Sequence, residues 1–216
     1  SEMCIRDRCI GMMLHGGVVA AMGTFFVFSD YMKPAVRIAA LMQVPVKFIW
    51  THDAFRVGED GPTHEPVEQE AQIRLMEKLK NHAGKDSVRV FRPADADETT
   101  VCWKLAMENV ETPTALIFSR QGIAKLPEGT DYEQAAKGAY IVAGSDENPD
   151  VILVASGSEV STLEAGCEAL RADGIKVRVV SAPSEGLFRG QSKEYQESVL
   201  PVSYTHLRAH ETGRNL

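Results

Sequence analysis

Short apolar runs alternate with stretches of helical periodicity along the first half of the chain. Runs rich in β-branched and aromatic residues predict buried strands at residues 44–50, 87–91 and 114–118. Between them, apolar positions recur at helical spacing and predict helices over residues 34–42, 67–80 and 96–108. The second of these helices carries its apolar residues on one stripe: Val67, Ala71, Leu75 and Leu79. This rhythm predicts an α/β fold, a parallel sheet with helices on both faces.

A second pattern of the same kind follows a segment rich in glycine and proline. We interpret this segment, residues 125–150, as a linker that contains one weak strand. Beyond it, residues 151–156 and 175–181 predict two strands, and residues 157–173 predict the helix that joins them. Such a unit cannot bury both faces of a sheet by itself. We therefore expect residues 151–201 to be the start of a truncated second α/β domain.

The two ends of the chain carry neither period. Residues 1–8 (SEMCIRDR) and 202–216 (VSYTHLRAHETGRNL) resemble translated sequencing-adaptor sequence. Segments of this kind are set aside before the fold is considered. We therefore expect native sequence over residues 9–201, with the first domain at residues 9–124. Natural frayed termini are the alternative.

The amino-acid composition excludes some classes of binding partner. Of 216 residues, 44% are hydrophobic and 25% charged, and 23 basic against 30 acidic side chains give a formal net charge of −7. An acidic chain lacks the basic face that nucleic acids require, and no apolar run approaches the ~20 residues of a membrane helix. We expect neither a nucleic-acid nor a membrane partner. Four cysteines without a CxxC pair fit a reducing, cytoplasmic compartment and offer no metal-site spacing.

Three aromatic residues recur at every third position of one segment. They are Phe25, Phe28 and Tyr31 of GTFFVFSDY. On one face of a helical turn, three such rings could stack on a flat heteroaromatic ring. The spacing alone leaves open a plain aromatic core cluster.

A polar loop, THDAFRVGEDGPTH at residues 51–64, directly follows the first buried strand. In open α/β sheets, ligands bind at the carboxyl ends of the strands. His52, Asp60 and His64 could there donate to or accept from a polyhydroxylated, phosphorylated substrate. Two histidines 12 residues apart do not have a standard zinc spacing. A solvated loop is the open alternative.

Arg120 follows a second predicted strand, in the sequence FSRQ. A guanidinium group at a strand end can hold a phosphate through paired hydrogen bonds. The strand-end positions of His52 and Arg120 predict that both reach one anion. An ordinary surface arginine is the alternative.

Together, these segments resemble the transketolase family. The segments GTFFVFSDYMKPAVRIAALM, THDAFRVGEDGPTHEPVEQEA, RPADADET and ALIFSRQ are similar to its pyrimidine-binding domain, and LVASGSEV and VVSAPS to the start of its C-terminal domain. The GEDGPTH sequence by itself marks only the wider thiamine-diphosphate superfamily. FSDYMKPA, SRQ and SGSEV narrow the resemblance to transketolases. It covers essentially all of residues 9–201.

The resemblance implies thiamine diphosphate as the cofactor. Phe25, Phe28 and Tyr31 match the family's pocket for the aminopyrimidine ring. The Mg²⁺ or Ca²⁺ ion that anchors the diphosphate belongs to an upstream domain with a Gly-Asp-Gly motif, which this sequence lacks. By count, Glu2 falls near the glutamate that activates the ring. Because residues 1–8 depart from the family pattern, we take that match as a coincidence.

The resemblance also implies a role for each polar candidate. His52 and Arg120 match positions that hold the phosphate of the sugar substrate. Asp60 matches the acid that recognises the hydroxyl beside the donor carbonyl. His64 matches the catalytic histidine at the donor's first hydroxyl and the reacting carbon.

The activity implied is transfer of a two-carbon ketol unit from a ketose phosphate to an aldose phosphate, in the pentose phosphate pathway. The family's sites form between two subunits, so a homodimer is implied, and this chain alone should be inactive. Dihydroxyacetone synthase and deoxyxylulose-phosphate synthase share the GEDGPTH sequence and are alternatives. A non-catalytic α/β subunit that contributes half a site is a third hypothesis.

Overall fold

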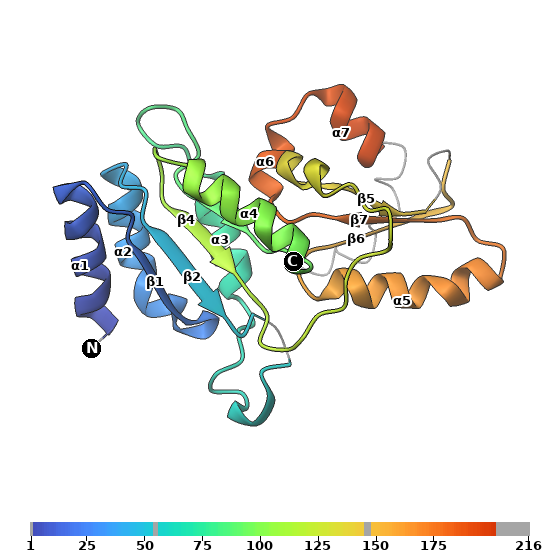
Figure 1. Ribbon diagram of the computed structural model, residues 1–216, viewed down its shortest axis with the longest axis horizontal. Helices are drawn as coiled ribbons and strands as arrows, with labels where there is room; N and C mark the ends of the chain where they lie inside the picture. Colours follow the sequence, from blue (N-terminus) through green and yellow to red (C-terminus); the bar gives the residue numbers. More distant parts are fainter. Residues whose placement is uncertain (1, 54–55, 145–147, 202–216) are drawn as a thin grey trace, which may run out of the picture.

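Two α/β units follow one another in the computed structural model, which describes residues 2–53, 56–144 and 148–201 (Figure 1). The elements of the first unit are α1 (Glu2–His15), β1 (Ala21–Phe25), η1 (Phe26–Phe28), α2 (Ser29–Leu41), β2 (Lys47–Thr51), η2 (Gly58–Asp60), α3 (Gln69–Lys78), β3 (Arg89–Phe91), α4 (Ala96–Glu108) and β4 (Thr114–Ile117). Those of the second are η3 (Tyr132–Lys137), β5 (Tyr140–Ala143), β6 (Val151–Ala155), α5 (Glu159–Ala172), β7 (Val177–Ser181), α6 (Glu185–Arg189) and α7 (Lys193–Val199).

The first sheet has the strand order β1-β2-β4-β3, and all of its neighbours are parallel. The carboxyl ends of the strands therefore meet at one edge, toward which the arrowheads of β2 and β4 point in Figure 1. The parallel sheet predicted from the alternating pattern is confirmed.

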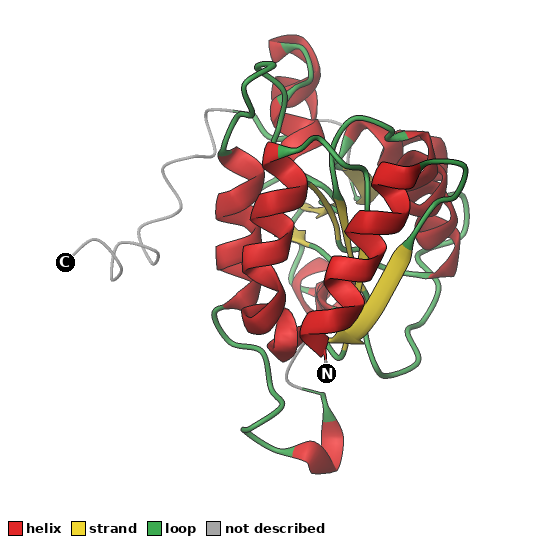
Figure 2. Cartoon of the chain, turned by 90° about the vertical axis from the view of Figure 1, so that its left-hand side faces the viewer, coloured by secondary structure: helices red, strands yellow, loops and turns green. Residues whose placement is uncertain are grey.

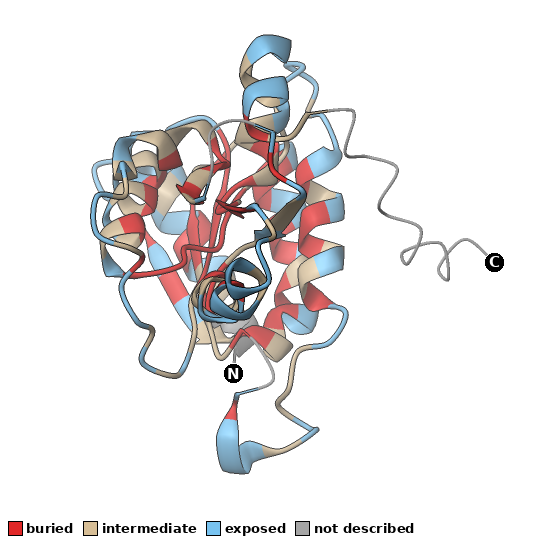
Figure 3. Cartoon of the chain, turned by 90° about the vertical axis from the view of Figure 1, so that its right-hand side faces the viewer, coloured by how far each residue is buried: buried red, intermediate tan, exposed pale blue. Residues whose placement is uncertain are grey.

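Helices cover both faces of this sheet. Because side chains alternate along a strand, Phe48 and Trp50 of β2 face α2 and α3 and pack in one core. On the opposite face, Leu116 of β4 packs with Cys102 and Ala106 of α4. Figure 2 looks at the molecule from the side of α1 and α2. Figure 3 shows that buried positions follow the strands and the inner faces of the helices.

The second unit contains a mixed sheet of order β5-β7-β6. β6 and β7 are parallel and joined by α5, as predicted, whereas β5 runs antiparallel to β7. η3 and β5 lie within the segment interpreted as a linker, and β5 is its weak strand. Tyr140 of β5 is buried against Val160 and Val179, so this segment supplies part of the second core.

Two local predictions were wrong. α2 begins at Ser29, so Pro34 lies inside the helix and not in its first turn. In α3, the apolar stripe faces solvent, with Val67 83% and Leu75 61% exposed, while Arg74 and Glu77 are buried. The physical reason lies in the second unit, where residues of α6 pair with both buried charges.

None of the helices in the described part of the chain combines the length and the apolar composition needed to cross a bilayer.

Candidate functional site

The three aromatic candidates lie where the chain passes from strand to helix. Phe25 ends β1, Phe28 lies in η1 and Tyr31 belongs to the first turn of α2. The prediction that they share one helical face was therefore wrong, since Phe25 is extended. The rings nevertheless lie side by side, with centroids 6.3 Å apart for Phe25 and Phe28 and 6.2 Å apart for Phe28 and Tyr31. Tyr31 is 61% exposed, so one end of this aromatic row is open to solvent.

Both histidines of the polar loop contact this row. His52 directly follows β2, and its ring stacks on Phe25 with centroids 3.6 Å apart. His64 meets Phe28 edge-on, with centroids 5.4 Å apart. The hydroxyls of Thr51 and Thr63 lie 2.9 Å and 2.8 Å from Nδ1 of the histidines that follow them. These contacts orient each imidazole against an aromatic neighbour.

His52 lies in a mixed electrostatic environment. Burial lowers its pKa, and Arg120 and His64 act in the same direction. Asp60 and Asp53 oppose them and raise it, but the net change is downward. The ring is therefore neutral near pH 7 and can donate one hydrogen bond and accept another.

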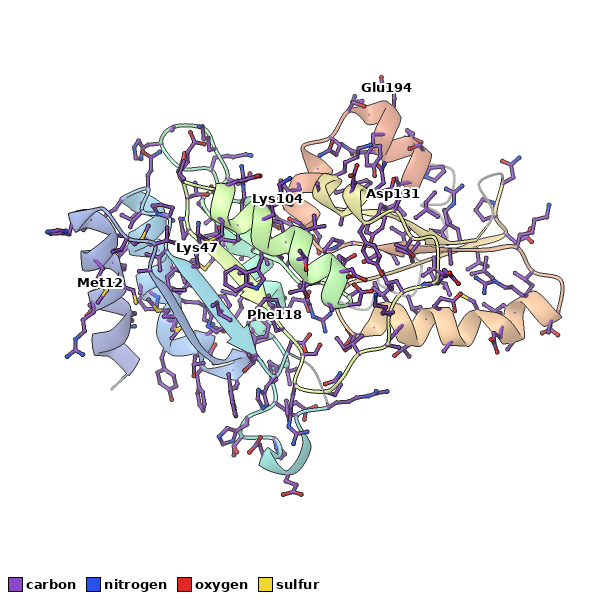
Figure 4. All side chains as sticks on the ribbon, in the orientation of Figure 1. Met12, Lys47, Lys104, Phe118, Asp131 and Glu194 are labelled. Atoms are coloured by element: carbon purple, nitrogen blue, oxygen red, sulfur yellow. The ribbon has the colours of Figure 1, made fainter. Side chains whose placement is uncertain are left out.

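Arg120 lies at the end of β4 and reaches the same loop. A Cβ atom built on Gly58 would lie 3.2 Å from its Cζ atom, so the guanidinium packs against η2, which ends at Asp60. Gly58 has a φ of +79°, which suits a residue without a side chain. Arg120 and Asp60 are both exposed. Side chains gather at this edge of the sheet below Phe118 in Figure 4.

Sequence reasoning missed three polar side chains next to the candidates. The Oγ atoms of Ser29 and Ser119 and the Nε2 atom of Gln121 are buried, and no hydrogen-bond partner is found for them in the described residues. Buried polar atoms are normally paired. Ser29 lies between Phe28 and Tyr31, and the other two flank Arg120 in the SRQ sequence. An aminopyrimidine ring beside the aromatic row fits these residues, because it offers both an aromatic face and polar atoms.

A metal site needs several ligating side chains close together. Among residues 2–53, 56–144 and 148–201, no group of three or more His, Cys, Asp or Glu could hold a metal ion. Glu2 is the first residue of α1, and its side chain lies outside the described ones.

Comparison with known proteins gives a consistent result across sequence and structure. Residues 1–125 match the family model described as transketolase, pyrimidine binding domain, and residues 138–215 match the transketolase-like C-terminal domain. The transketolase of Halalkalibacterium halodurans is 50% identical over 208 residues, which are 95% of this chain and 30% of that protein. The chain therefore spans about a third of this relative's length.

Solved structures give the same family. The transketolase of Leishmania mexicana matches with a TM-score of 0.82 at 38% identity, over 93% of this chain and 28% of that one. A Pichia stipitis transketolase in complex with sedoheptulose-7-phosphate matches with a TM-score of 0.74 at 42% identity, over 84% of this chain and 25% of that one. The matched domains, the parallel sheet and the clustered loop residues lead to one conclusion: this chain belongs to the transketolase family.

Proposed function

We propose that this chain forms the pyrimidine-binding part of a transketolase site, which transfers a two-carbon ketol unit from a ketose phosphate to an aldose phosphate. The observation that carries the proposal is the aromatic row of Phe25, Phe28 and Tyr31 lying against His52 and His64. When bound, thiamine diphosphate supplies the carbanion chemistry that the transfer needs. The residues of this chain bind and orient the cofactor ring and the sugar.

Phe25, Phe28 and Tyr31 hold the aminopyrimidine ring by stacking and edge contacts. Aromatic pairs of this kind contribute about 0.5–1.5 kcal/mol beyond their buried area. The unpaired hydroxyl of Ser29 is available for a hydrogen bond at the same place. His52, which covers Phe25, must share that surface with the incoming ring.

His52 and Arg120 bind the phosphate of the sugar. The guanidinium supplies a permanent positive charge and paired donors. The neutral imidazole, whose pKa is lowered by burial and by Arg120, adds an N–H donor without a second charge. A sugar phosphate bound in the Pichia stipitis relative supports this substrate class.

Asp60 and His64 act on the middle and the reacting end of the sugar. Asp60 accepts a hydrogen bond from the hydroxyl beside the donor carbonyl and disfavours the opposite epimer. His64 is oriented by Thr63 and holds or moves a proton at the donor's first hydroxyl. The turn that carries His64 directly follows Asp60 and is held by a backbone bond of 3.1 Å from the His64 N–H to the Gly61 carbonyl.

In the parent protein, a second subunit completes the site, as a homodimer. Large apolar side chains exposed on and after α1 support a subunit contact there: Met12, Leu14, Val18 and Val19 are each more than half exposed. The Mg²⁺ or Ca²⁺ ion belongs to a segment outside this chain. The free thiols of Cys9, Cys102 and Cys167 agree with a cytoplasmic enzyme of the pentose phosphate pathway.

We keep the division of the chain into a pyrimidine-binding domain at residues 9–124, a linker that begins at residue 125 and a truncated C-terminal domain that contains residues 151–201. The two family matches leave only residues 126–137 between them, and residues 138–150 go with the second unit, since its family match begins at residue 138 and β5 pairs with β7. The proposal that residues 1–8 and 202–216 are not native rests on their sequences alone; the family matches include residues 1–8 and 202–215, and α1 begins at Glu2.

The test is a chimera in which residues 9–201 replace the corresponding segment of the Halalkalibacterium halodurans transketolase. With thiamine diphosphate and Mg²⁺, we expect ketol transfer by the chimera and none by the 216-residue chain alone. In the chimera, Arg120→Ala should raise KM for phosphorylated sugars about 10–100-fold and leave unphosphorylated analogues nearly unchanged. Lys104→Ala, an exposed cation on α4, is the matched control. A folded chimera without activity would contradict the proposal.

A further inference from the structure

Arg92 lies just beyond β3 and is 5% exposed. Its guanidinium group forms hydrogen bonds and ion pairs with residues of both units of the fold. Its Nε donates to Oδ2 of Asp53 at 2.8 Å, and its Nη1 donates to the carbonyl of Ser156 at 3.0 Å. Its Nη2 lies 2.6 Å from Oε2 of Glu159, and Nη1 lies 3.5 Å from Oε2 of Glu70. One buried side chain therefore connects the loop after β2, helix α3 and the second unit.

The second unit encloses Arg92 with the turn Ser156–Glu159, which we call the SGSE turn. Gly157 donates its backbone N–H to the Arg92 carbonyl at 3.0 Å. Its φ is +61°, and a Cβ atom at this position would lie 2.8 Å from Cζ and Nε of Arg92. A side chain at Gly157 would therefore displace the guanidinium. The SGSE turn contacts both the backbone and the side chain of Arg92.

On the other side, Arg92 anchors the residue next to His52. Asp53 is buried, and its Oδ2 is bonded to Arg92. His52 has a φ of +61°, a left-handed conformation that is uncommon for a residue with a side chain. Such a conformation persists only where the surrounding structure holds it. The bond from Arg92 to Asp53 fixes the backbone directly after this strained residue.

We infer that Arg92 is a positioning residue through which the SGSE turn of the second unit sets the place of His52 in the proposed site. The substrate role of His52 rests on the proposed function, whereas its position is a property of this chain. The inference gives the second unit an effect on the site through a defined chain of contacts: Ser156–Glu159, Arg92, Asp53 and His52.

The charges around Arg92 keep it in its ionised form. Burial lowers its pKa, but Glu70, Asp53 and Glu159 raise it, and the net direction is upward. Removing the guanidinium would leave Asp53 buried without its cation, which is strongly unfavourable. Either the loop that carries Asp53 then moves toward water, or the uncompensated negative charge of Asp53 acts electrostatically on the neighbouring side chains. His52 directly precedes Asp53 in the sequence and is a titratable neighbour of its carboxylate.

The test follows the imidazole resonances of His52 by NMR during a pH titration of the full 216-residue chain. The charged and titratable groups that face His52 are Asp53, Asp60, Arg120 and His64. In Arg92→Gln, the uncompensated Asp53 carboxylate should raise the pKa of His52 by an amount on the order of 0.5.

The matched control is Arg178→Gln. Arg178 of β7 is 3% exposed and donates to the carbonyls of Ser198 and Val199. Its loss should lower the unfolding temperature without moving the pKa of His52. A merely structural role of Arg92 would give the same result as this control, and an unchanged His52 pKa in folded Arg92→Gln would overturn the inference.

Gly157→Ala keeps the inference testable if Arg92→Gln does not fold. The added Cβ should displace the guanidinium from Asp53 and move the His52 pKa in the same upward direction by a smaller amount. An unmoved His52 would count against the inference. Because no ligand is used, failure of sugar-phosphate binding would reject the proposed function and leave this titration unaffected.

Discussion

Polar side chains at the edge of the first sheet differ sharply from those between the two units. Between the units, Glu98 is fully buried and accepts hydrogen bonds from Ser181 at 2.7 Å, Tyr140 at 2.9 Å and the Ala94 N–H. At the sheet edge, the buried atoms of Ser119 and Gln121 have no partner in the described residues. Buried polar atoms that pair within the chain serve its stability. The atoms of Ser119 and Gln121 flank Arg120 in the proposed site, where a bound ligand would meet them, whereas the atoms of Arg74 and Ser184 that also have no hydrogen-bond partner in the described residues lie near the junction of the units.

The largest expected effect is on the interface between the units. Glu98→Ala should lower the free energy of unfolding of the chain by about 3–5 kcal/mol, because three donors lose their acceptor at ~1–3 kcal/mol each with partial relaxation. Chemical denaturation measures it. Glu108→Ala, an exposed carboxylate on the same helix α4, should change little. Similar midpoints for the two variants would show that Glu98 does not hold the units together.

A substitution in the aromatic row should affect ligand binding and leave the stability of the fold nearly unchanged. Phe28→Ala in the chimera should weaken thiamine diphosphate binding by about 1–3 kcal/mol while the fold stays intact, since the ring is only partly buried. Isothermal titration measures the affinity. Phe188→Ala, an aromatic residue of the second unit that contacts Tyr195, is the control with the same change in size. Unchanged cofactor affinity in Phe28→Ala would make the row a plain core cluster.

The smallest effect is a dependence of stability on pH. Burial raises the pKa of Glu98 above its ordinary value of 4.5, although hydrogen bonds from Ser181, Ala94 and Tyr140 partly oppose this. A carboxyl group whose folded-state pKa is raised contributes stability below its ordinary pKa and loses it as the pH rises through the raised value. The unfolding free energy of Glu98→Gln minus that of the native chain should therefore increase with pH, by no more than about 1.4 kcal/mol per pH unit. Denaturation at several pH values measures this difference. If it stays constant between pH 4 and pH 7, the pKa of Glu98 is the same in the folded and unfolded states.

Much of the site was predictable because its chemistry is local in sequence. His52, Asp60 and His64 lie within one loop after a strand, and strand-end position brings Arg120 to the same edge. The arrangement of the aromatic row was not predictable from spacing. Every third position suits a helix, but the chain forms a strand at Phe25 before it turns. The parallel pairing of β1 with β2 decides this, and it joins residues far apart in sequence.

The sequence by itself determined the α/β class, the parallel first sheet, most strand and helix positions and the family. These follow from hydrophobic periodicity and from motifs within short segments. Tertiary structure alone decided which face of α3 is buried, because Arg74 and Glu77 find their partners in α6. It also brought Asp53, Arg92 and the SGSE turn together. Charged residues are normally expected at the surface, and only partners contributed by distant segments make their burial favourable.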